Sequence, residues 1–183
     1  MVETPIAEWG MNGTVAEKGA AFRQLADEHL DASYGLACAI LRDPSEAQDA
    51  VHDAFLTAWR RWETLREPAS FPWWFRRIVV NTCRDRLRRG TRHPTVALPD
   101  EPVVLTGDPT GLVHDHAVLD RAFAVLSADE KVVLILRYFL DLQTDDIARL
   151  LDIRPGTVGS RLHRAQARLR VALTEADHAE AIS

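Results

Sequence analysis

Two short segments of this 183-residue chain are crowded with arginine, and clustered arginines suit contacts with phosphate. Residues 76–92 hold seven arginines against a single acid, Asp85, and residues 153–173 hold five arginines and no acid. The rest of the chain is acidic, so the formal net charge is −5 although both segments are basic. The pattern favours nucleic-acid contacts at two places, while the acidic stretches suit a basic protein partner or simply solubility.

A pair of tryptophans, Trp73 and Trp74, precedes the first basic segment in SFPWWFRRIVVNTCRDRLRRG, residues 70–90. Neighbouring residues of a helix point about 100° apart, so the two rings cannot both be centred in one core. An outward indole beside arginines would form a platform on which unpaired bases stack. Packing of both rings against Trp59 and Trp62 is the structural alternative. Asn81 lies two turns from Trp74, where it could hydrogen-bond a base edge or simply face solvent.

The second basic segment lies in a helix-turn-helix pattern, QTDDIARLLDIRPGTVGSRLHRAQARLR, residues 143–170. We expect a short helix over 144–151, a turn at 152–154, and a longer helix that begins at Pro155 and ends near Leu173. The first part of such a helix enters the major groove, where arginine recognises guanine and serine or threonine is less strict. The residues expected on this face are Thr157, Ser160, Arg161, His163, Arg164 and Arg168. A helical hairpin with a solvated basic face is the alternative.

Helices must position these residues, because apolar side chains recur at helical spacing and no β pattern of any length appears. Further helices are expected over about 17–42, 43–62, 71–89 and 116–126, and one more begins at Ser127. Asp43 followed by Pro44 predicts the start of the second helix, and Ser127 with Glu130 forms a capping-box pattern. Proline and glycine interrupt the stretch between Gly90 and residue 116, which predicts a linker.

The fold class is therefore all-α, with two small helical domains joined by a flexible linker and a helix-turn-helix in the second. The expected organisation is a flexible N-terminal arm (1–16), a first domain (17–90), the linker (91–116), a second domain (117–173) and a C-terminal tail (174–183). This division follows the loss of periodicity in the linker, which is long for a loop inside one compact domain.

Composition and motifs argue against several other classes of protein. No apolar run approaches the roughly 18–20 residues that cross a bilayer, and the acidic N-terminus does not resemble a signal peptide, so we expect a cytoplasmic protein. Cys38 and Cys83 are far apart and suit a reduced, buried pair. The HDH sequence at 114–116 suits a solvated linker better than a metal site. We expect no cofactor, no metal and no catalytic residue, and hence not an enzyme.

Three motifs resemble those of the extracytoplasmic-function (ECF) sigma factors of bacterial RNA polymerase. They are DPSEAQDAVHDAFLTAWRRW (43–62), FPWWFRRIVVNTCRDRLRR (71–89) and LSADEKVVLILRYFLDLQTDDIARLLDIRPGTVGSRLHRAQARLR (126–170). Residues 19–89 resemble region 2 of that family and residues 119–172 resemble region 4. The resemblance implies a protein that directs core polymerase to specific promoters and assists promoter melting.

The resemblance also implies roles for particular residues. Region 2 docks on the clamp helices of the polymerase β′ subunit through positions matched here by Asp49, His52, Asp53 and Leu56. The −10 element is bound and opened by residues matched by Trp73, Trp74, Arg76, Arg77, Asn81 and Arg84. Region 4 binds the −35 element through the helix that begins at Pro155, with Thr157, Ser160, Arg161, His163 and Arg164 facing DNA, and contacts the β flap. An anti-sigma factor is a further candidate partner, and no membrane contact is implied.

Two positions depart from the family pattern, and the linker receives a possible role. Glutamine is usual where His52 stands, and lysine or arginine is usual where Gly159 stands, so one DNA contact is expected to be lost. In the family the linker threads toward the polymerase active site, where acidic side chains mimic nucleic acid. Residues Asp100, Glu101, Asp108 and Asp115 match that role, and a merely soluble tether is the alternative.

Two other functions remain open from the residues themselves. An autonomous transcriptional regulator would explain the helix-turn-helix equally well, although not the tryptophan and arginine segment at 71–89. Such a regulator should bind duplex DNA unaided, whereas a sigma factor should bind core polymerase and start transcription. A protein adaptor whose basic helices bind acidic partners is the third hypothesis, and weak salt dependence of DNA binding would favour it.

Overall fold

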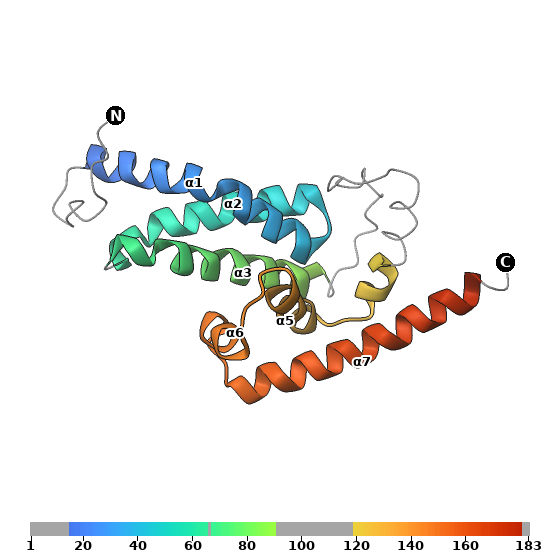
Figure 1. Ribbon diagram of the computed structural model, residues 1–183. Helices are drawn as coiled ribbons and strands as arrows, with labels where there is room; N and C mark the ends of the chain where they lie inside the picture. Colours follow the sequence, from blue (N-terminus) through green and yellow to red (C-terminus); the bar gives the residue numbers. More distant parts are fainter. Residues whose placement is uncertain (1–14, 66, 91–118, 181–183) are drawn as a thin grey trace.

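The computed structural model describes residues 15–65, 67–90 and 119–180, and every regular element within them is helical (Figure 1). The helices are α1 (Val15–Leu41), α2 (Pro44–Arg60), α3 (Phe71–Gly90), α5 (Ala128–Tyr138), α6 (Thr144–Leu151) and α7 (Pro155–Glu180), with a further helical stretch at 119–124. Short 3-10 turns at Trp62–Thr64 and Pro68–Ser70 join α2 to α3. The expected all-α class is confirmed. No helix in the described segments has the length and apolar character needed to cross a membrane.

Two helix starts follow from the capping residues that the sequence indicates. The side chain of Asp43 accepts a hydrogen bond of 2.8 Å from the backbone N–H of Glu46, and Pro44 occupies the first helical position of α2. Ser127 caps α5, and its backbone N–H donates to Glu130 at 2.9 Å while its hydroxyl accepts from the backbone N–H of Glu130. These contacts satisfy backbone groups that the first turn of a helix leaves unpaired.

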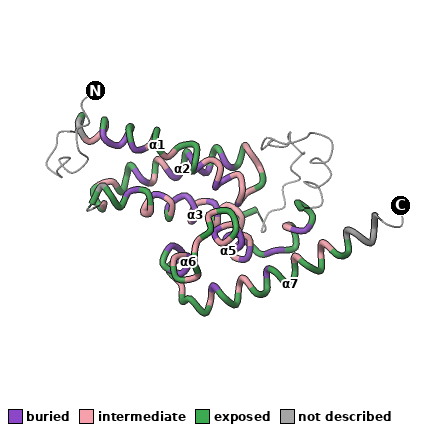
Figure 2. Tube along the Cα trace, viewed as in Figure 1, coloured by how far each residue is buried: buried purple, intermediate pink, exposed green. Residues whose placement is uncertain are grey.

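Helices α1, α2 and α3 form a bundle around an apolar core. Small side chains line the buried stripe of α2, and they let its neighbours approach closely: Ala47, Ala50, Ala54 and Ala58. Helix α3 adds Phe71 and Phe75, whose rings stack with centroids 5.3 Å apart. Phe75 also stacks on Phe55 at 4.5 Å. Figure 2 shows the buried stripes of these helices turned toward one another.

Helices α5, α6 and α7 form the second group, and this group packs against the first. Val132, Leu136, Ile147 and Leu150 are buried in one cluster with the core residues of the first bundle. Helix α5 contacts both α1 and α3, and α6 contacts α3, as the arrangement in Figure 1 shows. The helix-turn-helix is therefore held against region 71–90 rather than standing apart from it.

Helix α7 is longer than the sequence period indicates. It continues to Glu180, whereas the apolar stripe predicted an end near Leu173. Residues 174–180, TEADHAE, contain no glycine or proline and favour a helix by their alanines and glutamates, although they have no apolar stripe of their own. The expected linker (91–116) and nearly all of the expected N-terminal arm (1–16) lie outside the described residues, and the last two residues of that arm belong to α1.

Candidate nucleic-acid interface

The helix-turn-helix consists of α6, a turn at residues 152–154, and α7. Asp152 ends α6 in the left-handed conformation, with φ 56° and ψ 50°, which an aspartate tolerates better than most residues. The backbone N–H of Ile153 then donates to the carbonyl of Ala148 at 3.0 Å, and α7 begins at Pro155. Val158 and Ala165 of α7 are fully buried. The turn and this packing fix which side of α7 faces outward.

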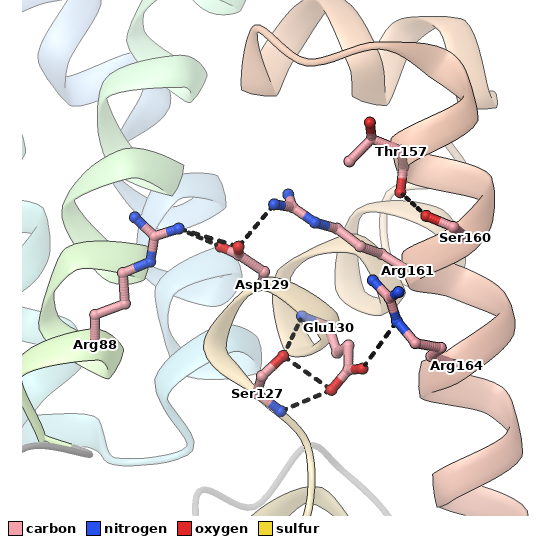
Figure 3. Close-up of polar contacts among 8 residues, drawn as sticks. All are labelled: Arg88, Ser127, Asp129, Glu130, Thr157, Ser160, Arg161 and Arg164. Atoms are coloured by element: carbon pink, nitrogen blue, oxygen red, sulfur yellow. Dashed lines mark hydrogen bonds and ion pairs between the residues drawn. The ribbon is translucent and has the colours of Figure 1, made fainter.

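The outward side of α7 carries three of the five residues expected to contact the −35 element. Ser160, His163 and Arg164 are exposed, and Thr157 is half-buried. The hydroxyl of Ser160 donates to the carbonyl of Thr157 at 3.0 Å, one turn earlier in the same helix (Figure 3). This bond leaves the oxygen of Ser160 able to accept a hydrogen bond from a base.

Arg161, the fifth residue, points toward α5 instead of outward. Its side chain is 18% exposed, and its guanidinium pairs with Asp129 at 2.8 Å. Arg88 of α3 donates to both oxygens of the same carboxylate, at 2.8 and 3.0 Å, so Asp129 lies between the two helix groups (Figure 3). The structure thus places Arg161 in a contact between helices.

Glu130 lies beside Asp129 and contacts the next two arginines of α7. Its carboxylate is buried, accepts from Arg168 at 2.9 Å, and faces Nε of Arg164 at 3.8 Å. Burial alone would raise the pKa of Glu130, but the hydrogen bonds from Ser127 and the charges of Arg168 and Arg164 outweigh it and hold the pKa below its ordinary value. Glu130 therefore stays ionised at neutral pH.

The two adjacent tryptophans of α3 are both half-buried, and both pack against the main core. The ring centroids of Trp74 and Phe71 are 5.9 Å apart. The ring of Trp73 faces the guanidinium of Arg149 in α6 at 5.8 Å. The expected outward indole is thus partly covered by the helix-turn-helix group, and the alternative of packing on Trp59 and Trp62 does not describe these ring contacts.

The polar residues expected at the −10 element follow α3 beyond the tryptophans. Arg77 is exposed and pairs with Asp152 at 3.3 Å, which joins α3 to the turn before α7. Arg76, Asn81 and Arg84 are half-buried. The Nε atom of Arg84 is buried and has no hydrogen-bond partner among the described residues. The structure brings these side chains together on α3, and the charge of Arg77 already has a protein partner in Asp152.

The residues expected to dock on polymerase lie together on the exposed side of α2. Asp49, His52 and Asp53 are exposed, and Leu56 is 41% exposed although it is apolar. Asp53 also accepts a 2.6 Å hydrogen bond from Arg86 of α3. The helix thus presents a mixed acidic and apolar surface.

Sequence reasoning missed several contributors to these surfaces. Trp59, which the sequence suggested as a packing partner for the tryptophan pair, is 43% exposed, and its ring contacts Phe22 with centroids 5.2 Å apart. Asp129 and Glu130 carried only a capping signal. They lie 32 to 38 residues from the arginines of α7 that they contact, and a separation of that length gives no indication of contact.

Other expected features cannot be placed or have no counterpart. The four linker acids and the HDH sequence lie outside the described residues. Within the described segments, no group of three histidine, cysteine, aspartate or glutamate side chains could hold a metal ion. Cys83 is buried and Cys38 half-buried, and both are free thiols.

Two family models match the chain in the order that the motifs indicate. The model for sigma-70 region 2 matches residues 25–93, and the model for sigma-70 region 4 matches residues 116–169. The first match covers most of α1 together with α2 and α3. The second covers α5, α6 and the first half of α7.

Relatives and solved structures agree with these matches. The chain is 37% identical over 155 residues to the ECF RNA polymerase sigma factor SigM of Mycobacterium tuberculosis, covering 85% of this chain and 78% of SigM. It is 33% identical to the RNA polymerase sigma-E factor of Streptomyces coelicolor, covering 85% and 88%.

Among solved structures, the fold is similar to the sigma factor RpoE of Bartonella quintana, solved in complex with the anti-sigma factor NepR. The TM-score is 0.62 at 24% identity, over 84% of this chain and 96% of RpoE. It is also similar to CnrH in complex with the cytosolic domain of CnrY, with a TM-score of 0.59 at 25% identity, over 87% and 90%. The identities of 37% and 33% over most of both chains, with both family models matched in order, show that this chain belongs to the ECF sigma factors of RNA polymerase.

Proposed function

We propose that this chain directs core RNA polymerase to specific promoters in the cytoplasm and assists their melting, as an initiation factor and not an enzyme. The observation that carries the proposal is the outward side of α7. There Ser160, His163 and Arg164 are exposed on a helix whose opposite side is buried in a complete helix-turn-helix. Residues 117–173 are then the domain that binds the −35 element, and residues 17–90 the domain that binds polymerase and the −10 element.

The residues proposed for the −10 element are those along α3. Trp73 and Trp74 are half-buried, so the exposed parts of their rings can stack on bases that leave the duplex. Arg76, Arg77 and Arg84 supply positive charge on the same helix, and Asn81 supplies a hydrogen-bonding amide. The contacts of Trp73 with Arg149 and of Arg77 with Asp152 must open before those two side chains can bind DNA fully.

The residues proposed for polymerase docking are those on α2. Leu56 supplies an apolar centre, and Asp49, His52 and Asp53 surround it with polar groups. We add Trp59, which is exposed one turn from exposed Leu56. Exposed aromatic and apolar side chains that lie close together are typical of a surface that a partner protein covers. The proposed partners are thus core polymerase and promoter DNA, and the complexes of RpoE and CnrH support an anti-sigma factor as a third.

The proposal is tested by adding the purified chain to core RNA polymerase on a library of random DNA fragments and mapping the transcript starts. New starts that share two sequence elements upstream are expected. If no new starts appear while the chain alone shifts duplex DNA specifically, the chain is an autonomous regulator and the proposal fails. Core polymerase without the chain supplies the background.

Two matched variants assign the helices. Arg164→Ala should reduce transcription from templates with an intact upstream element, while Arg170→Ala, an exposed arginine farther along α7, serves as the control. Trp74→Ala should reduce the permanganate reactivity of unpaired thymines more than it reduces initial binding. Equal loss on every template, with a lower melting temperature, would instead indicate a folding defect.

A further inference from the structure

The first turn of α5 carries a buried carboxylate that contacts the arginines of α7 from the side opposite to solvent. Glu130 is 4% exposed. Its Oε2 atom accepts from the backbone N–H and the hydroxyl of Ser127, at 2.9 and 2.8 Å, and from Nη1 of Arg168 at 2.9 Å. A capping box needs an acceptor at this position but no charge, and glutamine serves there as well. The two arginines of α7 therefore give the charge at this position a role that the cap does not require.

Arg164 and Arg168 each contact Glu130 on one side and face solvent on the other. Their side chains are 59% and 52% exposed, for Arg164 and Arg168 respectively, although both approach a buried acid. Figure 3 shows Nε of Arg164 facing Glu130, with the terminal nitrogens turned away from it. The terminal nitrogens are the atoms that bind guanine or phosphate in bidentate fashion. Glu130 therefore contacts Arg164 without occupying its terminal nitrogens, whereas on Arg168 it engages one terminal nitrogen, Nη1.

This arrangement suits preorganisation. An arginine side chain on a bare helix surface samples many rotamers, and binding has to fix one of them. Arg164 and Arg168 lie one turn apart on the same face of α7, so a single carboxylate between them limits both at once. The burial of Glu130 reduces solvent screening on its side of each pair, although both arginine side chains are more than half exposed.

We propose that Glu130 is a positioning residue for recognition of the −35 element, because its buried carboxylate holds Arg164 and Arg168 in the orientation that binds DNA. The inference rests on the proposed sigma function. It extends the DNA-binding surface to a residue that does not touch DNA and lies on another helix. Loss of the carboxylate leaves both arginines charged, so nonspecific attraction to DNA persists while discrimination between sequences falls.

The test uses the full chain with core polymerase on one promoter found by the mapping experiment, with its upstream element intact or scrambled. Glu130→Gln keeps an acceptor for the cap and removes the charge. We expect the ratio of transcription from the intact over the scrambled template to fall roughly 3- to 10-fold, with output from the scrambled template unchanged or higher. Asp145→Asn, an exposed acid in the first turn of α6, changes net charge equally and should leave the ratio unchanged.

Two further variants separate positioning from stability. Glu130→Asp keeps the charge and the cap but shortens the side chain, so it should lower the ratio in the same direction even if Glu130→Gln folds poorly. Combined with Glu130→Gln, Arg164→Ala should cost less than it costs in the native chain, because the two changes act on one contact.

The inference is overturned if both Glu130 variants keep the native ratio, or if both lose output equally on the two templates in proportion to a lower melting temperature. Failure of the sigma function would look different, because the native chain would then start no transcription on any template. If the native chain initiates and Arg164→Ala lowers the ratio while neither Glu130 variant does, only the inference fails.

Discussion

Replacing Gly159 with alanine should stabilise the protein, and the structure allows the gain to be worked out. Gly159 lies in the interior of α7, between buried Val158 and exposed Ser160. A Cβ atom built there meets no heavy atom within 4 Å, and no described glycine has a positive φ. Alanine therefore fits without strain, and the helix gains the difference in propensity, about 1 kcal/mol.

Gly35 in the middle of α1 provides an independent copy of the same experiment. It too has nothing within 4 Å of an added Cβ, and it lies in the first helix group, far from α7 along the chain. Each substitution should raise the free energy of unfolding by about 1 kcal/mol, and the double variant by about 2 kcal/mol if the sites are independent. For a chain of this size, 1 kcal/mol corresponds to about 2–4 °C in melting temperature.

The assay is urea and thermal unfolding followed by far-ultraviolet circular dichroism. Gly156→Ala is the matched control, because its added Cβ also meets open space but lies in the first turn of α7, where helix propensity matters less. A smaller gain is expected there. Separate transitions for the two helix groups would show as a gain in one transition for Gly35→Ala and in the other for Gly159→Ala. Lower stability of Gly159→Ala beside a normal gain for Gly35→Ala would refute the reasoning about α7.

Three other predictions rest on single contacts. Burial raises the pKa of Cys83 to about 12, so iodoacetamide at mildly alkaline pH should label Cys83 only after denaturation; prompt labelling of both thiols in the folded chain would contradict this. The pKa of Glu130 is lower in the folded chain than its ordinary 4.5, so the carboxylate stabilises the fold above that pH and the contribution is lost as the pH falls below it. Glu130→Gln should therefore flatten the acidic part of a plot of unfolding free energy against pH. An unchanged plot would count against the ion pairs. Arg86 is mostly buried, and it pairs with Asp53 at 2.6 Å and Glu46 at 2.7 Å, both on α2. Arg86→Met should lower the free energy of unfolding by about 1–2 kcal/mol, a figure already reduced because both acids are half-exposed. Urea unfolding with no loss of stability would show that solvent already screens the two pairs.

The elements of this fold could be predicted from local sequence because their signals are local. Asp43 before Pro44, and Ser127 three residues before Glu130, mark helix starts through contacts within one turn. The short helix at 144–151 was predicted with the observed bounds, since its apolar residues are closely spaced and Asp152 ends it. The end of α7 was predicted too early, because helix propensity without an apolar stripe leaves no periodic signal.

The candidate site could be predicted in part, and the missing part depends on contacts between distant segments. Helical periodicity identified the exposed positions Ser160, His163 and Arg164. The same periodicity placed Arg161 among the exposed residues. Periodicity gives the direction of a side chain around α7, but it cannot show that Asp129 of another helix lies in that direction. The partial cover over Trp73 likewise comes from α6, about 75 residues away along the chain.

The carboxylate of Asp129, shared by Arg88 and Arg161, has a consequence for how the chain finds its promoter. Elements centred at −10 and −35 are about 25 base pairs, or about 85 Å of duplex, apart. The 28 residues between Gly90 and Leu119 can reach roughly 100 Å when fully extended, so the two helix groups can separate that far without breaking the chain. Asp129 cannot bridge them at that distance.

We propose above that α3 binds the −10 element and α7 the −35 element. On that assignment, molecules bound to both elements come from the fraction of the population in which the two helix groups are separated. The apparent dissociation constant equals the intrinsic one divided by that fraction, so every interdomain contact weakens promoter binding measured from the compact chain. On the same proposed assignment, affinity for a promoter depends partly on side chains that do not approach DNA, and whichever partner binds the separated form shifts the equilibrium toward it.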